Sequence, residues 1–152
     1  MTDEAANKCS VLFRIHNGGG IYSIPVEYVT WIESLDGKPV SVPHFPNHVV
    51  GVYHLHGKSV SIVDLGHLLG FEHLSNLESS NRNLLIIENT QLGFLVETVL
   101  GVEVLHSSQN AGPSSKELVH RVYSFDSGAE IIFELDVPHL LSLCSYLSKL
   151  GK

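Results

Sequence analysis

The chain has 152 residues, with nine Lys and Arg, sixteen Asp and Glu, and ten His, so its net charge is −7 when the histidines are neutral. An acidic chain with so few dispersed basic residues offers no surface that follows a phosphate backbone, which excludes nucleic-acid binding as an expected function. A hydrophobic fraction of 43% excludes a disordered chain, and the length favours one domain.

The first half of the chain predicts short strands joined by tight turns. Alternating or β-branched residues place the expected strands at 11–16, 21–24, 26–34, 40–42, 51–55 and 59–63. Asp36-Gly37 and His56-Gly57 are turn signals, because glycine accepts a positive φ without penalty. A short helical turn is expected from Asp64 to Leu69, closed by Gly70.

The second half also predicts short strands, which follow a polar loop. Leu74 to Asn83 is expected to be that loop and the seam between two subdomains. Further strands are expected at 84–88, 92–96, 99–105, 118–125 and 129–135. The Ser, Gln, Asn, Gly and Pro residues of 107–115 predict a second loop without secondary structure.

The C-terminus predicts a helix. Asp136 is an N-cap candidate and Pro138 is tolerated in a first helical turn. The apolar residues that follow have helical spacing and predict one docked stripe, with Gly151 as the stop: Leu140, Leu143, Cys144, Leu147 and Leu150. Nine or ten strands with hairpin-sized links and one helix predict an all-β barrel or sandwich, because parallel sheets need a helix at each crossover.

Neither membrane insertion nor export is expected. The longest aliphatic run, Leu84 to Ile87, is far too short to span a bilayer, and the acidic start lacks the apolar core of a signal peptide. We therefore expect a cytoplasmic protein whose two cysteines, Cys9 and Cys144, are thiols. Charged residues make up only 16% of the chain, against about 25% in ordinary domains. A surface so poor in charge is expected to contact protein.

No catalytic signature is present, so the expectation is a protein that is not an enzyme and uses no cofactor. His54 and His56 would share a face if both lay on one strand, which makes them the candidates for a metal site or a pH-sensitive interface. Spacing fixes no third ligand, and surface imidazoles remain the alternative. Trp31 suits either a core position or a partner-binding anchor.

Several stretches in order resemble the CheW-like domain of bacterial chemotaxis coupling proteins. Ile21–Val26 matches Y-x-I-P-V, Val42–Gly57 matches P-x-x-P-x-x-V-x-G-V-x-N-L-R-G, and Val60–Leu65 matches V-x-P-V-I-D-L. Later, Gly93–Glu97 with Val99 and Val102 resembles G-x-x-V-D-x-V-x-x-V, and Ile131–Val137 resembles the last strand, I-L-D-I.

The resemblance implies a single CheW-like domain at 11–150, after an N-terminal tail at 1–10. Its fold would be two small five-stranded SH3-like β-barrels packed together, plus a short C-terminal helix, with the seam near 74–83. It implies a non-enzymatic chemotaxis adaptor between the tip of a methyl-accepting chemoreceptor and the regulatory domain of a CheA-type histidine kinase. The resemblance is equally compatible with an adaptor of a related sensory system, such as the one that controls twitching motility.

The resemblance also implies which residues bind partners. Val29, Trp31 and Ile32 lie on the strand that resembles the receptor-facing one, and Val99 and Val102 lie on its counterpart in the second half. The turn Leu55-His56-Gly57 resembles the one that bears the family's arginine. His56 replaces that arginine and His54 replaces the usual asparagine. Arginine has five donors and a permanent charge, whereas histidine has at most two donors and a charge that varies with pH.

Overall fold

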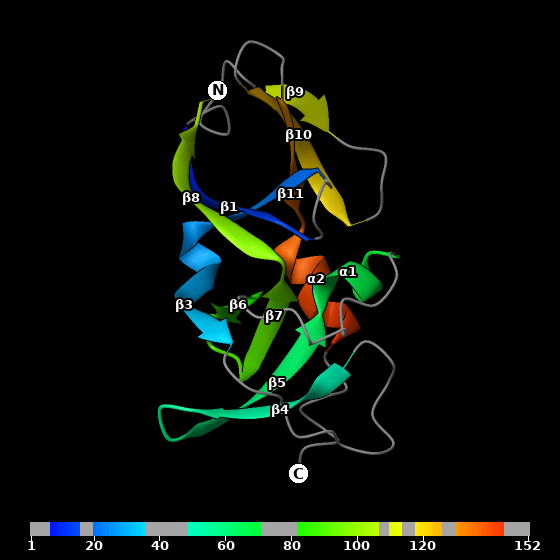
Figure 1. Ribbon diagram of the computed structural model, residues 1–152. Coiled ribbons are helices and arrows are strands. Elements are labelled where there is room, and N and C mark those ends of the chain that lie inside the picture. Colours follow the sequence, from blue (N-terminus) through cyan, green and yellow to red (C-terminus); the bar gives the residue numbers. More distant parts are fainter. Residues whose placement is uncertain are drawn as a thin grey trace.

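The computed structural model describes residues 7–15, 20–35, 49–70, 82–106, 110–113, 118–125 and 130–144 (Figure 1). Strands dominate in these residues, and three short helical segments accompany them there. The strands are β1 (Lys8–Arg14), β2 (Ile21–Pro25), β3 (Val29–Leu35), β4 (Val49–Leu55), β5 (Lys58–Asp64), β6 (Arg82–Ile87), β7 (Leu92–Val96), β8 (Thr98–Leu105), β9 (Asn110–Pro113), β10 (Val119–Phe125) and β11 (Glu130–Leu135). The helical segments are the 3₁₀ turn η2 (Val26–Tyr28) and the helices α1 (Leu65–Leu68) and α2 (Val137–Leu143).

The strands form two sheets. The first has the order β8-β1-β2-β11-β10-β9, and the second has the order β3-β6-β7-β5-β4. Neighbouring strands are antiparallel except for the parallel pairs β2–β11 and β5–β7. The all-β class is confirmed. The two expected five-stranded barrels correspond to two curled sheets that are not closed, because the described outer strands of each sheet do not pair with each other, and β9 gives the first sheet a sixth strand.

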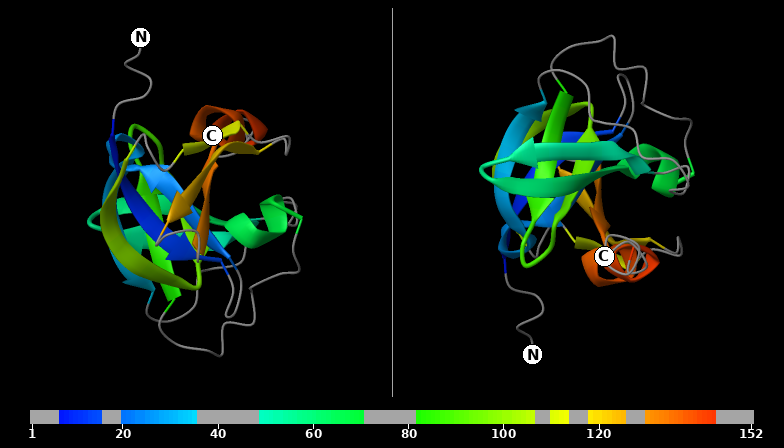
Figure 2. Two further views of the ribbon diagram at one scale, coloured as in Figure 1. Left: turned by 90° about the horizontal axis from the view of Figure 1, so that it is seen from above. Right: turned by 90° about the horizontal axis from the view of Figure 1, so that it is seen from below.

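Each sheet nevertheless curls around its own small core. In the second sheet all five strands contribute to one cluster: Leu35, Leu55, Val60, Ile62, Leu84, Ile86 and Leu95. The first sheet encloses a smaller cluster: Leu12, Ile21, Leu105, Tyr123 and Ile132. The largest cluster, called the shared core here, joins residues from both sheets and from α2, among them Phe13, Phe94 and Leu140. The shared core therefore joins the two sheets into one body, which Figure 2 shows from above and from below.

Three segments differ from the sequence expectation. Residues 26–28 form a 3₁₀ turn and not a strand, since Pro25 has no N–H for a ladder and stands at φ −57° before the turn. Residues 110–113 form β9 within a predicted loop, because the edge of β10 supplies backbone partners. Arg82 and Asn83 belong to β6 and not to the loop before it, with Asn83 paired to Val96.

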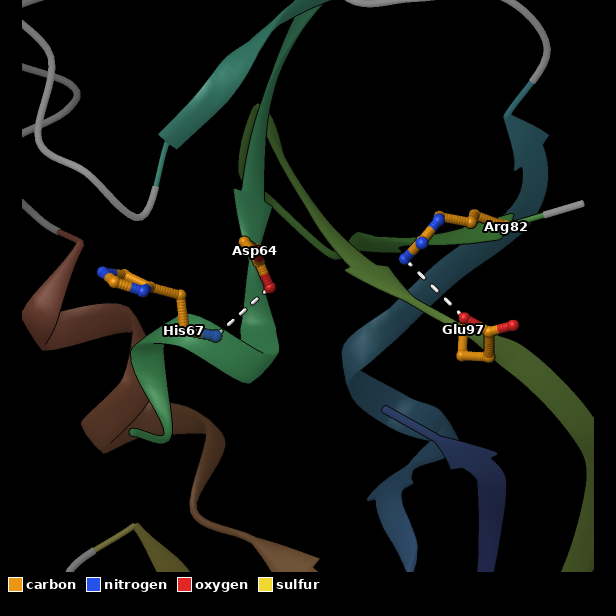
Figure 3. A network of polar contacts seen from close by, with 4 residues as sticks. All are labelled: Asp64, His67, Arg82 and Glu97. Atoms are coloured by element: carbon orange, nitrogen blue, oxygen red, sulfur yellow. Dashed lines mark hydrogen bonds and ion pairs between the residues drawn. The ribbon is translucent and has the colours of Figure 1, made fainter. Parts of the chain in front are cut away.

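Both helix starts behave as predicted. The Oδ1 atom of Asp64 accepts a hydrogen bond from the His67 N–H at 3.2 Å (Figure 3), and Asp136 accepts one from the His139 N–H at 3.1 Å. Gly70 has a φ of 99°, as the predicted helix end requires. In α2 the Leu143 side chain is 37% exposed, so it does not belong to the packed stripe of Leu140 and Cys144. The expectations for the N-terminal tail at 1–6, Asp36-Gly37, 40–42, the loop and seam at 74–81, and 145–152 lie outside the described residues.

The two cysteines are free thiols in contrasting surroundings, as expected, with Cys9 exposed and Cys144 buried. Burial raises the pKa of the Cys144 thiol to about 11, so the reactive thiolate is scarce at neutral pH. We predict that iodoacetamide modifies Cys9 in the native protein and leaves Cys144 unmodified, as peptide mass spectrometry would record. Unfolding in urea should make both react, and equal native labelling would contradict the burial of Cys144.

Candidate protein-docking interface

Strand β3 is an outer strand of the second sheet, and its side chains alternate between the core and the surface. Trp31 is half-buried and packs against the cluster inside the second sheet. Ile32, on the opposite face of the strand, is 38% exposed. Val29, at the start of β3, packs against the shared core. The three predicted contact residues of this strand therefore divide into one exposed and two half-buried side chains.

The turn between β4 and β5 places His56 against β3. Leu55 pairs with Lys58, and both residues between them have a positive φ, 50° at His56 and 80° at Gly57, as in a type I′ hairpin turn. The rings of His56 and Trp31 meet edge to face with centroids 5.3 Å apart. The Nε2 atom of His56 lies 3.5 Å from Oε1 of Glu33. Leu55 itself is buried, so it supports the turn from within.

Strand β8 is an outer strand of the first sheet and carries a row of exposed apolar side chains. Val102 is 54% exposed, and Leu100 and Val104 are 48% and 45% exposed. We call these three residues the β8 stripe. The pairing with β1 passes from Gly101 directly to Val99, so Leu100 is bulged out of the ladder beside Gly101, whose φ is 144°.

The beginning of β8 is fixed to the second sheet by two polar contacts. The backbone N–H of Val99 donates to Oδ1 of Asn83 at 3.0 Å, and Val99 packs against the shared core. Glu97, just before β8, places Oε1 3.7 Å from Nη1 of the buried Arg82 (Figure 3). These contacts hold β8 in place relative to β6. As a result β3 and β8 lie on the same side of the molecule (Figures 1 and 2).

The predicted partner-binding residues thus occupy three environments. Four are exposed: Ile32, His56, Gly57 and Val102. Three are half-buried: Val29, Trp31 and Val99. The eighth, Leu55, is buried. Leu100 and Val104 were missed by the sequence prediction, although their alternation with Val102 along one strand was a usable signal. The sequence could not predict that Leu100 and Val104 are exposed, because alternation alone does not tell which face of a strand meets solvent.

The two candidate metal ligands are separated. Tyr53 and Leu55 face the interior of the second sheet, so the exposed His54 between them points from the other face of β4. His56 is turned toward Glu33 and Trp31. In the described part of the chain no three His, Cys, Asp or Glu residues come together as a metal site. No described helix is long and apolar enough to cross a membrane.

Two curled sheets share a core, and one outer strand of each sheet exposes large apolar side chains. The sequence pattern of the CheW-like domain matches residues 10–144, and the chain belongs to that family. It is therefore a CheW-like adaptor domain of chemotaxis signalling. The crystal structure of the scaffolding protein TtCheW from Thermoanaerobacter tengcongensis is similar in fold, with a TM-score of 0.71, 18% sequence identity, and coverage of 85% of this chain and 88% of that one. A comparison with curated proteins gives no match.

Proposed function

We propose that the protein is a non-enzymatic adaptor that joins the tip of a chemoreceptor to the regulatory domain of a CheA-type histidine kinase, or to the equivalent components of a twitching-motility system. It acts in the cytoplasm, at membrane-associated receptor arrays, and needs no cofactor. Family membership supports the class of partner.

The observation that carries the proposal is the β8 stripe. Three large apolar side chains, each 45–54% exposed, follow one another along a single outer strand. Scattered exposed apolar residues are ordinary, but a contiguous row marks an interaction site. Its only charged neighbour on the strand is Glu103, so docking there desolvates few charges. An apolar helical segment, such as one arm of a receptor tip, would bury the stripe.

The proposed docking surface combines the β8 stripe with Ile32 and the His56 turn. Trp31 is less exposed, and His56 covers part of it. Tryptophan is enriched among the residues that contribute most to the binding energy of protein interfaces. We therefore assign Trp31 the role of an anchor that becomes fully available when the turn moves. Val29 and Val99 support the surface from below through the shared core.

A binding experiment with two separate partners tests this function. The purified chain would be titrated by isothermal calorimetry with the kinase's regulatory domain and, independently, with a soluble receptor-tip fragment. We expect saturable binding to at least one of them, and a deletion strain with impaired taxis or twitching. Absence of binding to both, together with normal motility of the deletion strain, would reject the proposal.

A further inference from the structure

The second sheet leaves a seam between its two outer strands, β3 and β4. These strands stand at opposite ends of the strand order and share no ladder in the described structure. Both nevertheless contribute to the same enclosed cluster, through Leu35 on β3 and Leu55 on β4. His56, one residue beyond β4, reaches across this seam to the indole of Trp31. The seam is thus bridged by side chains where a closed barrel would have backbone hydrogen bonds.

The bridge consists of two weak contacts. One is the edge-to-face contact of the His56 and Trp31 rings. The other is the 3.5 Å pair of His56 Nε2 and Glu33 Oε1, with side chains 65% and 30% exposed. That pair is an ion pair only when the imidazole is protonated, and its distance is too long for a strong hydrogen bond to a neutral ring. The attraction between His56 and Glu33 is therefore stronger when the His56 imidazole is protonated.

Among the charged residues near His56, Glu33 is the one whose carboxylate lies beside the imidazole. Glu33 is the single charged residue on β3. His54 and Lys58, which flank the turn, are both exposed. Arg82 pairs with Leu35 at the far end of β3, and its Nη1 atom lies near the carboxylate of Glu97. Protonation of His56 therefore adds an attraction across the seam that the neutral ring lacks.

The bridge covers the indole of the chain's single tryptophan. The Trp31 Nε1 atom is buried, and it meets no hydrogen-bond acceptor among the described residues. A buried N–H without an acceptor favours any rearrangement that exposes it to water or to a partner's oxygen. His56 also sits at a positive φ, where a residue with a side chain has a modest backbone cost. Both features favour opening of the turn.

We propose that His56 is a proton-controlled latch across the seam between β3 and β4. With the imidazole protonated, the latch is closed over Trp31. With the imidazole neutral, the turn opens more often and the indole becomes accessible. The latch itself is a property of the isolated chain. Its regulatory consequence, weaker docking of a partner that uses Trp31 at lower pH, rests on the proposed function.

The single tryptophan makes the latch measurable without a partner. Acrylamide quenching of Trp31 fluorescence would be recorded at about pH 5.5 and about pH 8, which bracket the ordinary titration range of histidine. We expect the quenching constant to be about two- to fivefold larger at the higher pH, as an exposed ion pair of ordinary strength would give.

Matched variants separate the latch from the other histidines. His56→Arg keeps a permanent charge next to Glu33, so its quenching should stay low at both pH values. Glu33→Gln keeps the imidazole but removes the carboxylate, so the pH dependence should disappear. His54→Gln, which removes an exposed histidine two residues away, should behave as wild type.

Two results would overturn the latch. One is an unchanged pH dependence in Glu33→Gln or His56→Arg, because the responding group would then lie elsewhere. The other is a wild-type quenching constant that is the same at both pH values. Neither result depends on a receptor or kinase, so failure of the latch and failure of the proposed adaptor function are recognised separately. Circular dichroism would confirm that each variant is folded.

Discussion

The variant Val102→Arg is expected to bind the receptor-tip fragment about 100-fold more weakly than the wild type, while its thermal stability stays the same. Val102 is 54% exposed at the centre of the β8 stripe, so an arginine there has room in the free protein. In the complex it would bring an unpaired charge into the apolar centre of the interface, which costs far more than the contact it replaces. Isothermal calorimetry measures the affinity.

Ile131→Arg is the matched control for this substitution. Ile131 is 50% exposed, but β1 and β2 separate its strand, β11, from β8. The control has the same change in charge, a slightly smaller change in volume and a similar exposure, so it should bind the fragment like the wild type. Equal loss in both variants would indicate a general effect of charge, and full affinity in Val102→Arg would remove the β8 stripe from the receptor site.

Lys8→Met is expected to lower the free energy of unfolding by about 2–3 kcal/mol. Lys8 Nζ lies 3.5 Å from Oε2 of Glu134, whose side chain is only 1% exposed inside the first sheet. Neither carboxylate oxygen of Glu134 has a hydrogen-bond partner among the described residues, and the Ser10 and Ser23 hydroxyls on the same face of the sheet make none either. Removal of Lys8 leaves a buried charge uncompensated.

The expected loss in the free energy of unfolding for Lys8→Met is smaller than for a fully buried ion pair. Lys8 is 38% exposed, so water compensates part of the lost interaction. Urea unfolding measures the change. Adding Glu134→Gln to Lys8→Met should recover about half of the stability, since the unpaired charge is gone. Lys58→Met, at an exposed position, should change the stability by less than about 0.5 kcal/mol. A similar loss at both lysines would contradict the buried-charge explanation.

Tyr123 provides a second readout of the Glu134 charge. Burial first, and then the negative charge of Glu134, raise the pKa of the Tyr123 phenol, while Arg121 opposes them. In Glu134→Gln the second cause is absent, so the phenol should ionise at a lower pH than in the wild type. Ultraviolet absorbance during an alkaline titration measures this difference. An unchanged titration would mean that Glu134 does not act on Tyr123 as a charge.

The sequence alone determined what depends on near neighbours in the chain. The β4–β5 hairpin follows from His56-Gly57, because a glycine in a tight turn between two β-forming segments readily takes the positive φ that such a turn needs. The helix starts at Asp64 and Asp136 follow from side chains that accept a hydrogen bond three residues ahead. The motif order was enough to identify the CheW-like family. These features can be predicted from residues that are close together in the chain.

The tertiary structure alone decided what depends on residues far apart in the chain. Asn110–Pro113 is a strand because it pairs with the edge of β10. The buried Arg82 lies next to the carboxylate of Glu97, and only the fold brings these two residues together. The β8 stripe is exposed because the folded chain leaves these side chains of β8 uncovered. Trp31 and His56 meet because the second sheet curls, which brings its opposite edges together. Local propensity carries no information about such pairings, since their energy comes from packing between segments that only the folded chain brings into contact.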